Sequence, residues 1–337
     1  MRKAGLDLCR IAACLAVVSI HTVMLFWDFD PAAPAWAVFN FLSLAVRFGV
    51  PLFFMLSGAL LLGRERLDFG KHLRRTGHFV LLFYLWSLIG YGLDAALFHV
   101  WTPGGDFLSL VLSGYYHEWF LAALVLCYCA VPLLHGLIHG ERDNARKGAW
   151  LLCGVVIGLA TLSAVPDKPP ILAALLAPWK LSDLRYLVYF LLGWQLDGKK
   201  LTRRGLGLLG ASALAVLLLF ARLNRTCALS LGQAAGPYYG YLLLPAALTA
   251  AFVFCLCQQA EAVSPRAAGL LQRLSGCVFG VYLLHPLCID ALRGLHLPFE
   301  SHSALWLLPA CYLGFLLTSL GLTALLKKLP LLRELVR

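Results

Sequence analysis

Long apolar runs follow one another along almost the whole chain, and each could form a membrane-spanning helix. About 20 residues of helix cross the hydrocarbon core of a bilayer, and only helices or closed barrels satisfy the backbone inside lipid. The runs are continuous, which does not fit the alternating pattern of a membrane barrel. The pattern therefore predicts an all-α polytopic membrane protein. The expected helices are at residues 6–27, 37–62, 78–99, 117–138, 148–165, 184–198, 205–222, 238–258, 271–292 and 303–326, ten in all.

The composition supports this interpretation. Of 337 residues, 61% are hydrophobic and 13% are charged, whereas soluble domains are about half apolar and about a quarter charged. The chain is thus neither an ordinary soluble protein nor a disordered one. Arg10 interrupts the apolar stretch after Arg2 and Lys3, so we expect a first helix rather than a cleaved signal peptide. We expect one transmembrane domain over residues 1–337, with no appended soluble domain.

The basic residues are concentrated in alternate loops. The formal net charge of +11 would permit a nucleic-acid partner, but loops rich in lysine and arginine face the cytoplasm in membrane proteins. The alternation therefore predicts that both termini are cytoplasmic, and it requires no nucleic acid. Most of the 28 lysines and arginines fall in the segments 2–3, 64–75, 142–147, 199–204, 266–273 and 327–337.

Cysteine and histidine spacing predicts no metal site. The 11 cysteines lie mostly inside apolar runs, without a C-x-x-C pair or zinc spacing, so we expect them to behave as small apolar residues. His135 and His139 have the i, i+4 spacing of a metal-binding pair, but no third ligand accompanies them.

The first predicted helix carries three polar residues, Asp7, Arg10 and His21. A charge inside a span costs a few kcal/mol and is a functional-site hypothesis by default. Eleven residues of helix turn by about 1100° and rise by about 16 Å, so Arg10 and His21 share one face, with His21 deeper. Asp7 can pair with Arg10. The structural alternative is an interfacial ion pair and a histidine that bonds to another helix.

Arg47 falls near the middle of the second predicted helix, four residues before Pro51. Proline lacks an N–H, so the carbonyl of residue 47 loses its helical donor, and a cation and an open carbonyl share one turn. Ser57 and Gly58 permit close approach of a helix or a ligand. The structural alternative is a kinked packing helix with a structural arginine.

Two further predicted helices carry polar residues. His117 and Trp119 open the fourth helix, where we expect them near the outer face, and Tyr282 and His285 precede Pro286 near the end of the ninth. The motifs G-x-S-x-G, Walker A, G-x-G-x-x-G and H-E-x-x-H are all absent. Any chemistry must therefore use buried histidine and arginine.

Together these elements resemble the acyltransferase-3 family of membrane O-acyltransferases. The resemblance rests on Asp7-x-x-Arg10, Arg10-x10-His21, Arg47-Phe-x-Val-Pro-Leu-Phe-Phe-Met-x-Ser57-Gly58, His117-x-Trp-Phe-Leu, Tyr189-Phe-Leu-Leu-Gly193 and Ser275…Tyr282-Leu-Leu-His285-Pro286. Their order and spacing extend along nearly the whole chain. The chain looks like the shorter members, which act on surface glycans and lack a periplasmic hydrolase-like domain.

The resemblance implies a bacterial inner (plasma) membrane enzyme with no bound cofactor. Acetyl-CoA, or another short acyl-CoA, would be the co-substrate from the cytoplasm, and a hydroxyl of a cell-envelope sugar or lipid-linked glycan would accept the acyl group. The essential histidine of the family matches His21, and its arginine matches Arg10.

Two positions depart from the family pattern. Its Arg-x-x-Arg pair before the third helix has no clear match in Lys71-His-Leu-Arg74-Arg75-Thr-Gly-His78, where the pair is either Lys71/Arg74 or Arg75/His78. Longer members place a glutamate where this chain has Leu124, so no carboxylate role is supported there.

The residue chemistry fits acyl transfer. Lys71, Arg74 and Arg75 belong to the densest basic cluster and can hold the phosphates of coenzyme A, although the same cluster also serves as a topology signal. Arg10 and Ser57 complete the expected acyl-CoA site. His21 is the expected general base, with Arg47 or a hydroxyl stabilising the oxyanion. An acyl-histidine intermediate is the less favoured route.

We expect four residues to bind the acceptor or line the cavity, namely His117, Trp119, Tyr282 and His285.

Two other functions stay open. One is a transporter or flippase of an envelope precursor or small solute, although no repeated halves are visible. The other is an amino-acid-moving role like that of the membrane half of certain serine racemases.

Overall fold

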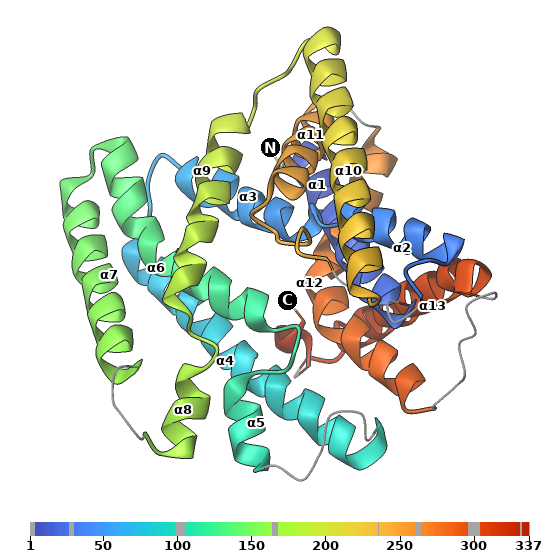
Figure 1. Ribbon diagram of the computed structural model, residues 1–337. Helices are drawn as coiled ribbons and strands as arrows, with labels where there is room; N and C mark the ends of the chain where they lie inside the picture. Colours follow the sequence, from blue (N-terminus) through green and yellow to red (C-terminus); the bar gives the residue numbers. More distant parts are fainter. Residues whose placement is uncertain are drawn as a thin grey trace. The chain divides into compact units, whose positions relative to one another are not determined.

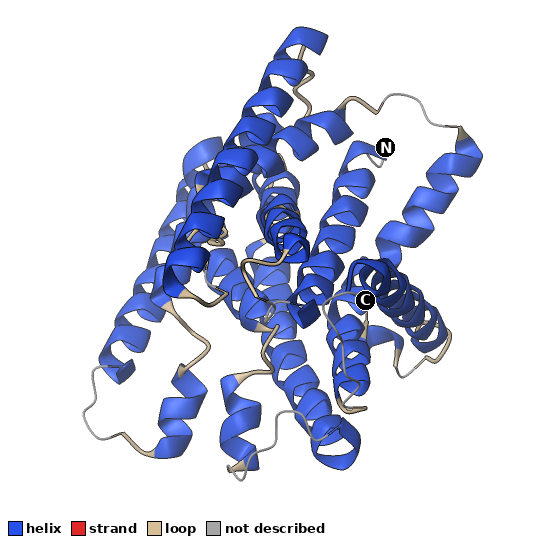
Figure 2. Cartoon of the chain, turned by 45° about the vertical axis from the view of Figure 1, so that its right-hand side comes forward, coloured by secondary structure: helices blue, strands red, loops and turns tan. Residues whose placement is uncertain are grey.

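The computed structural model describes residues 4–26, 30–98, 106–163, 168–234, 236–260, 264–295, 304–330 and 332–336. Within these ranges the secondary structure is helical, and no strand occurs (Figure 2). The α-helices are α1 (Ala4–Val23), α2 (Pro34–Ala45), α3 (Gly49–Leu62), α4 (Phe69–Leu93), α5 (Phe107–Ser113), α6 (Trp119–His139), α7 (Arg142–Ser163), α8 (Pro170–Leu176), α9 (Leu187–Leu196), α10 (Arg203–Leu231), α11 (Leu244–Gln258), α12 (Pro265–Arg293) and α13 (Ala304–Leu326). The short helical turns are η1 (Met24–Phe26), η2 (Asp94–Phe98), η3 (Leu181–Tyr186) and η4 (Arg333–Leu335).

Local signals explain where several long helices begin. The side chain of Thr202 accepts a hydrogen bond from Gly205 N before α10, and Ser264 does the same for Ala267 N before α12. Pro265 follows at the first helical position, where its missing N–H costs nothing.

In the described residues, eight helical segments are long and apolar enough to cross a membrane. They correspond to eight of the ten expected helices, and the count of ten is not confirmed. The expected span 184–198 consists of η3 followed by the ten-residue α9, and the expected span 238–258 contains the fifteen-residue α11. Both helices are shorter than the roughly 20 residues that a perpendicular span needs.

The span expected at 37–62 is present, but it is made of two helices rather than one. The helix ends at Ala45 and a new one begins at Gly49, although Pro34–Leu62 still forms one candidate span. Pro51 therefore lies in the first turn of α3, where a proline breaks no bond within the helix. Arg47 lies in the break between two half-helices rather than inside a helix.

The chain divides into two compact units. Unit one comprises residues 1–56 and 196–337, and unit two comprises residues 57–195. Each is described by itself, and the expectation of a single domain over 1–337 stays a prediction.

In unit one, α1, α12 and α13 pack around a shared apolar core, and α10 packs against α11 (Figure 1). The core brings together one face of α1, the middle of α12 and Phe315 of α13. Because lipid tails are as apolar as these side chains, van der Waals packing rather than removal from water stabilises such a core in a membrane. Its buried members are Cys14, Val18, Val278, Val281, Ile289 and Phe315.

In unit two, α6 and α7 lie side by side, and α4 packs on α6 (Figure 1). Glycines permit the close approach of α6 and α7. A Cβ on Gly148 would lie 2.2 Å from Leu133 N, and one on Gly136 would lie 2.4 Å from Ala145 N. Small residues at such contacts are typical of helix pairs in membranes.

Candidate active site

The centre of unit one holds two histidine rings from different helices. His21 lies near the end of α1 and His285 in the second half of α12, with their ring centroids 5.1 Å apart. The packing of α1 against α12 brings them together across a large separation in sequence. The ring of Tyr282 lies 6.4 Å from that of His285.

A backbone bond orients His285. Its Nδ1 lies 2.9 Å from the carbonyl oxygen of Val281, and because a carbonyl only accepts, Nδ1 is the donor. In the neutral ring Nε2 then carries the lone pair. His285 is fully buried, so it presents a fixed acceptor nitrogen inside the helix bundle.

Arg47 lies in the break between α2 and α3, and two tyrosine rings face it. Its Cζ is 5.0 Å from the ring centroid of Tyr239 and 5.2 Å from that of Tyr241. Its Nε is buried and has no hydrogen-bond partner among the described residues. The charges of Arg47 and Arg293 both act on the His21 ring, and Arg293 is itself paired with Asp290 at 3.3 Å.

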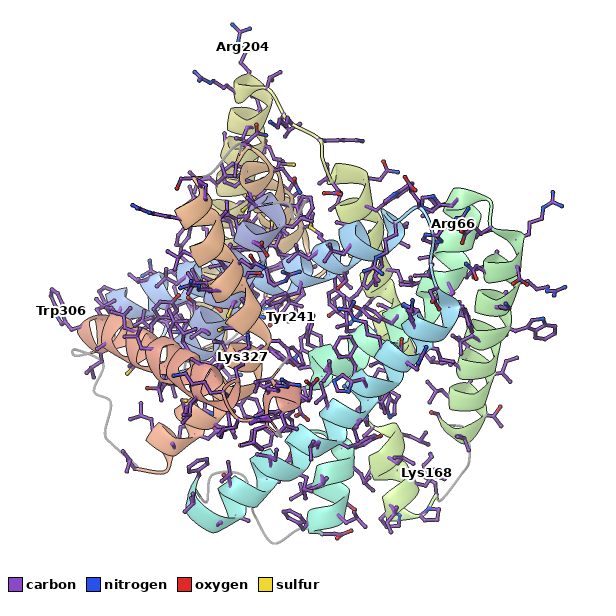
Figure 3. All side chains as sticks on the ribbon, turned by 180° about the vertical axis from the view of Figure 1, so that it is seen from behind. Arg66, Lys168, Arg204, Tyr241, Trp306 and Lys327 are labelled. Atoms are coloured by element: carbon purple, nitrogen blue, oxygen red, sulfur yellow. The ribbon has the colours of Figure 1, made fainter. Side chains whose placement is uncertain are left out.

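The tyrosines belong to the segment 236–243, which precedes α11. The Tyr239 hydroxyl donates to Asn40 Oδ1, and Tyr238 N donates to Asn224 Oδ1 at 3.2 Å. These bonds attach the segment to α2 and α10. Tyr241 is half-buried, whereas Trp306 and Arg204 project outward (Figure 3).

Sequence reasoning missed Tyr239 and Tyr241, because both fell at the start of an expected helix. A signal was present. Gly236-Pro237 and Gly240 disfavour helix in this stretch, and three tyrosines in a non-helical apolar segment suggest a ring-lined wall.

The cytoplasmic end predicted for α1 holds a separate polar cluster. Arg10 Nη1 donates to Asp7 Oδ1 at 3.1 Å and to Ser275 Oγ at 2.8 Å, and Ser275 Oγ donates to Asp7 Oδ1 at 2.6 Å. The predicted pairing of Asp7 with Arg10 is confirmed. The cluster ties α1 to α12 and fixes one guanidinium nitrogen of Arg10.

In unit two, a buried carboxyl group holds the turn that carries His117 and Trp119. Ser87 Oγ and Tyr115 N both donate to Glu118 Oε2. The His117 ring lies 5.7 Å from that of Tyr115, and the Trp119 ring lies against Tyr186. Glu118 precedes the span Trp119–His139, and burial raises its pKa to about 8 despite the two donors.

The basic residues expected to hold coenzyme A lie at the start of α4 and are exposed. Lys71 Nζ pairs with Asp68 at 3.2 Å, and the Arg75 guanidinium lies over the Phe79 ring. Arg74 Nε donates to the Gly70 carbonyl at 3.4 Å. These are weak surface contacts that leave the charges available to an anion.

Ser57 lies partly buried in α3. Its neighbour Gly58 explains the close approach there, because a Cβ on Gly58 would lie 2.0 Å from the carbonyl oxygen of Phe190.

His135 and His139 have a structural role. Their rings stack 4.4 Å apart, and their Nε2 atoms donate to the carbonyls of Arg64 and Leu62. They satisfy carbonyls at and after the end of α3, which a helix otherwise leaves open. In the described part of the chain, no group of three metal-ligating side chains is found.

The structure thus gathers His21, Arg47, Tyr282 and His285 in unit one, with Arg10 nearer the start of α1. The other candidate residues belong to unit two, namely Ser57, Lys71, Arg74, Arg75, His117 and Trp119. That both sets line one cavity stays a prediction.

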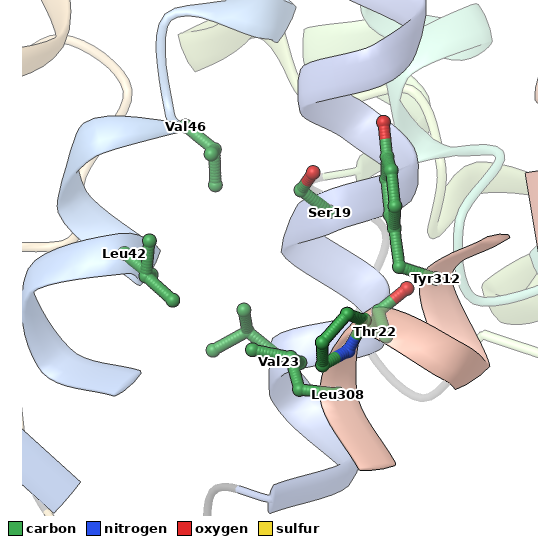
Figure 4. A pocket seen from close by; sticks show the side chains of 8 residues that line it. Ser19, Thr22, Val23, Leu42, Val46, Leu308 and Tyr312 are labelled. Carbon is green, nitrogen blue, oxygen red and sulfur yellow. The ribbon is translucent and has the colours of Figure 1, made fainter. Parts of the chain in front are cut away.

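A pocket lies on the other side of α1 (Figure 4). Ser19 and Val23 are each two residues from His21, about 200° around the helix. The hydroxyls of Ser19 and Thr22 donate to carbonyls of α1, so the lining is essentially apolar. The lining residues are Ser19, Thr22, Val23, Leu42, Val46, Leu308, Pro309 and Tyr312.

Comparison with known proteins identifies the family of this chain. A family model described as an acyltransferase domain (Acyl_transf_3) matches residues 3–327. An "Amino-acid racemase" of Enterococcus faecalis is 31% identical over 168 residues, which are 46% of this chain and 22% of that protein. The chain therefore covers only a minor part of that relative, and no solved structure matches. Because the family model covers nearly the whole chain, the chain belongs to the acyltransferase-3 family, and its long apolar helices point to a multi-pass membrane protein.

Proposed function

We propose that this protein transfers an acetyl or other short acyl group from cytoplasmic acyl-CoA to a hydroxyl of a cell-envelope sugar or lipid-linked glycan. The single observation that carries the proposal is the His21–His285 pair beside Arg47, in a chain of an acyltransferase family. This arrangement of side chains combines a general base with a cation in a water-poor environment.

The reaction needs one base and one stabilising cation. A neutral imidazole of His21 takes the proton of the acceptor hydroxyl as the oxygen attacks the thioester carbonyl. Arg47 stabilises the oxyanion of the tetrahedral intermediate. The C–S bond then breaks, and the coenzyme A thiolate takes the proton from the His21 imidazolium, which restores the neutral ring.

The donor and the acceptor enter from opposite sides in this proposal. The basic cluster of Lys71, Arg74 and Arg75 holds phosphates of coenzyme A at the cytoplasmic face, with Arg10 and Ser57 along the path of the thioester. The alternation of basic loops supports cytoplasmic termini in a bacterial inner membrane.

The acceptor side uses the remaining candidates. His117 and Trp119 bind the sugar, and Tyr282 and His285 line the cavity. The docking of the 115–119 turn on Ser87 supports this role, because a binding loop must be held rigidly.

The test uses purified protein in nanodiscs with radiolabelled acetyl-CoA and an envelope fraction that supplies the acceptor. Free thiol and label in the glycan fraction are measured together. We expect His21→Ala to bind acetyl-CoA normally and to lose at least 100-fold in transfer, the usual range for a general base.

Ser19→Ala is the matched control, because Ser19 lies on the same helix facing away from His21, and its hydroxyl donates to the Leu15 carbonyl. It should retain the wild-type rate. Wild-type transfer in His21→Ala would exclude His21 as the base. A wild-type protein that binds acetyl-CoA without releasing thiol would favour the transporter alternative.

A further inference from the structure

We propose that the acceptor carries an oxyanion group of its own, a phosphate or a carboxylate, which the Arg47 guanidinium binds at the wall formed by Tyr239 and Tyr241. This inference rests on the proposed function and names its substrate class. With Arg47 holding the anion of the acceptor, a side-chain hydroxyl, the other candidate from the sequence, stabilises the oxyanion of the tetrahedral intermediate.

The first argument is charge. In the described part of unit one, Asp7 pairs with Arg10 and Asp290 pairs with Arg293 at 3.3 Å. Arg47 forms no ion pair with any described residue, although it lies within the candidate span Pro34–Leu62. An uncompensated charge at this depth costs at least a few kcal/mol, so a bound anion would stabilise the site.

The tyrosines do not supply the missing charge. Burial raises the pKa of the Tyr239 hydroxyl, and it also raises the pKa of the Tyr241 hydroxyl, although Arg47 lowers both. Both phenols are therefore neutral at pH 7. Their rings attract the cation through cation–π contact, which positions the guanidinium without neutralising it.

The second argument is geometry. The guanidinium carbon of Arg47 lies over the faces of both tyrosine rings, and its buried Nε–H has no hydrogen-bond partner among the described residues, so this part of the guanidinium fork is left for a ligand. That fork matches two oxygens of a phosphate or carboxylate. Ser43, one turn before Arg47, is fully buried, and its Oγ has no hydrogen-bond partner among the described residues. A ligand with several acceptor oxygens would satisfy both groups.

The third argument concerns the side of the membrane on which the acceptor would bind. Helix α10 begins at the basic segment 199–204 and is 29 residues long, about 44 Å at 1.5 Å per residue. This exceeds the roughly 30 Å hydrocarbon core, so α10 carries the chain across to the segment 236–243. The tyrosine wall therefore belongs to the side opposite the basic segment 199–204.

The experiment compares three sugars that differ only in one group: glucose 6-phosphate, glucuronate and glucose. Their dissociation constants for the wild-type protein in nanodiscs are measured by calorimetry without acetyl-CoA, up to 20 mM. We expect at least one anionic sugar to bind at least tenfold more tightly than glucose. Tighter binding of glucose 6-phosphate would indicate a phosphate-bearing acceptor. Tighter binding of glucuronate would indicate an acceptor with an acidic sugar.

Variants then test Arg47 itself. Arg47→Gln should remove the preference for the anion, whereas Arg47→Lys should retain part of it, because lysine keeps the charge but not the fork. Acetyl-CoA binding is the control for folding. If Arg47→Gln fails this control, the comparison of Arg47→Lys with wild type decides.

Equal affinity for glucose and both anions would overturn the proposal, as would absence of binding by both anions. An anion preference that survives in a folded Arg47→Gln protein would overturn it too. Failure of the proposed function is a distinct result, since wild-type protein would then release no thiol from acetyl-CoA whatever its affinity for anions.

Discussion

At the scale of single residues, the polar side chains inside the helices are held by specific neighbours. His285 is oriented by the Val281 carbonyl, and Arg10 by Asp7 and Ser275. Glu118 differs, because it is a buried carboxyl group whose hydrogen-bond donors are a hydroxyl and a backbone amide. No basic side chain pairs with it among the described residues.

This environment predicts a pH dependence of stability. Burial raises the pKa of the Glu118 carboxyl from its ordinary value of 4.5 to about 8. Between these values the folded state binds more protons than the unfolded state, so stability falls as pH rises. Glu118→Gln removes that dependence. From pH 5 to pH 9 the Tm of wild type should fall more than that of the variant, by on the order of a few degrees.

Glu65→Gln is the control for this measurement, because Glu65 is exposed in the loop before α4. It should reproduce the wild-type pH profile. Parallel profiles for wild type and Glu118→Gln would show that Glu118 is ionised in the folded state across the whole range.

At the scale of elements, the breaks in helices matter as much as their lengths. The gap between α2 and α3 places Arg47 in non-helical backbone, after the end of α2 at Ala45 and before the start of α3 at Gly49. Discontinuous helices place ligand sites at membrane depth in the same way in transporters. By contrast, the α6–α7 pair is continuous and close-packed through glycine.

The packing of α6 on α7 predicts a strong effect of a side chain at Gly148. Gly148→Leu should force the two helices apart, because even its Cβ would overlap the backbone of Leu133. Overpacking typically costs about 1–3 kcal/mol, seen as a lower Tm in detergent. Gly154→Leu lies on the same helix with no atom within 4 Å of its Cβ, so it should leave Tm unchanged. Equal Tm values for the two variants would refute this packing.

At the scale of the whole molecule, topology decides which reactant reaches which residues. Eight candidate spans place both termini on one side, and the basic segment 199–204 lies on that same side only if the shorter α9 and α11 also cross. The basic loops predict that arrangement.

Reporter fusions test the topology. A green fluorescent protein fused after Arg337 should fluoresce, and alkaline phosphatase fused there should be inactive, because the enzyme needs the oxidising exterior to form its disulfides. Alkaline phosphatase fused after Gly232, at the end of α10, should be active. The reverse pattern would invert the assignment of donor and acceptor sides.

The amino-acid sequence was sufficient to predict the membrane class, eight of the candidate spans and the family. Hydrophobic length and the positions of charges are local properties, and the motifs of the family are read in order along the chain. It also predicted that Asp7 pairs with Arg10, because residues three apart on a helix are neighbours.

Only the tertiary structure placed His21 against His285, because that contact joins α1 to α12 across most of the chain. It also showed that residues 236–243 are non-helical and turn Tyr239 and Tyr241 toward Arg47. An apolar run looks the same whether it starts as helix or as loop, since lipid and protein interior both favour apolar residues. Which polar groups meet inside the bundle depends on helix packing, a long-range property that no local pattern encodes.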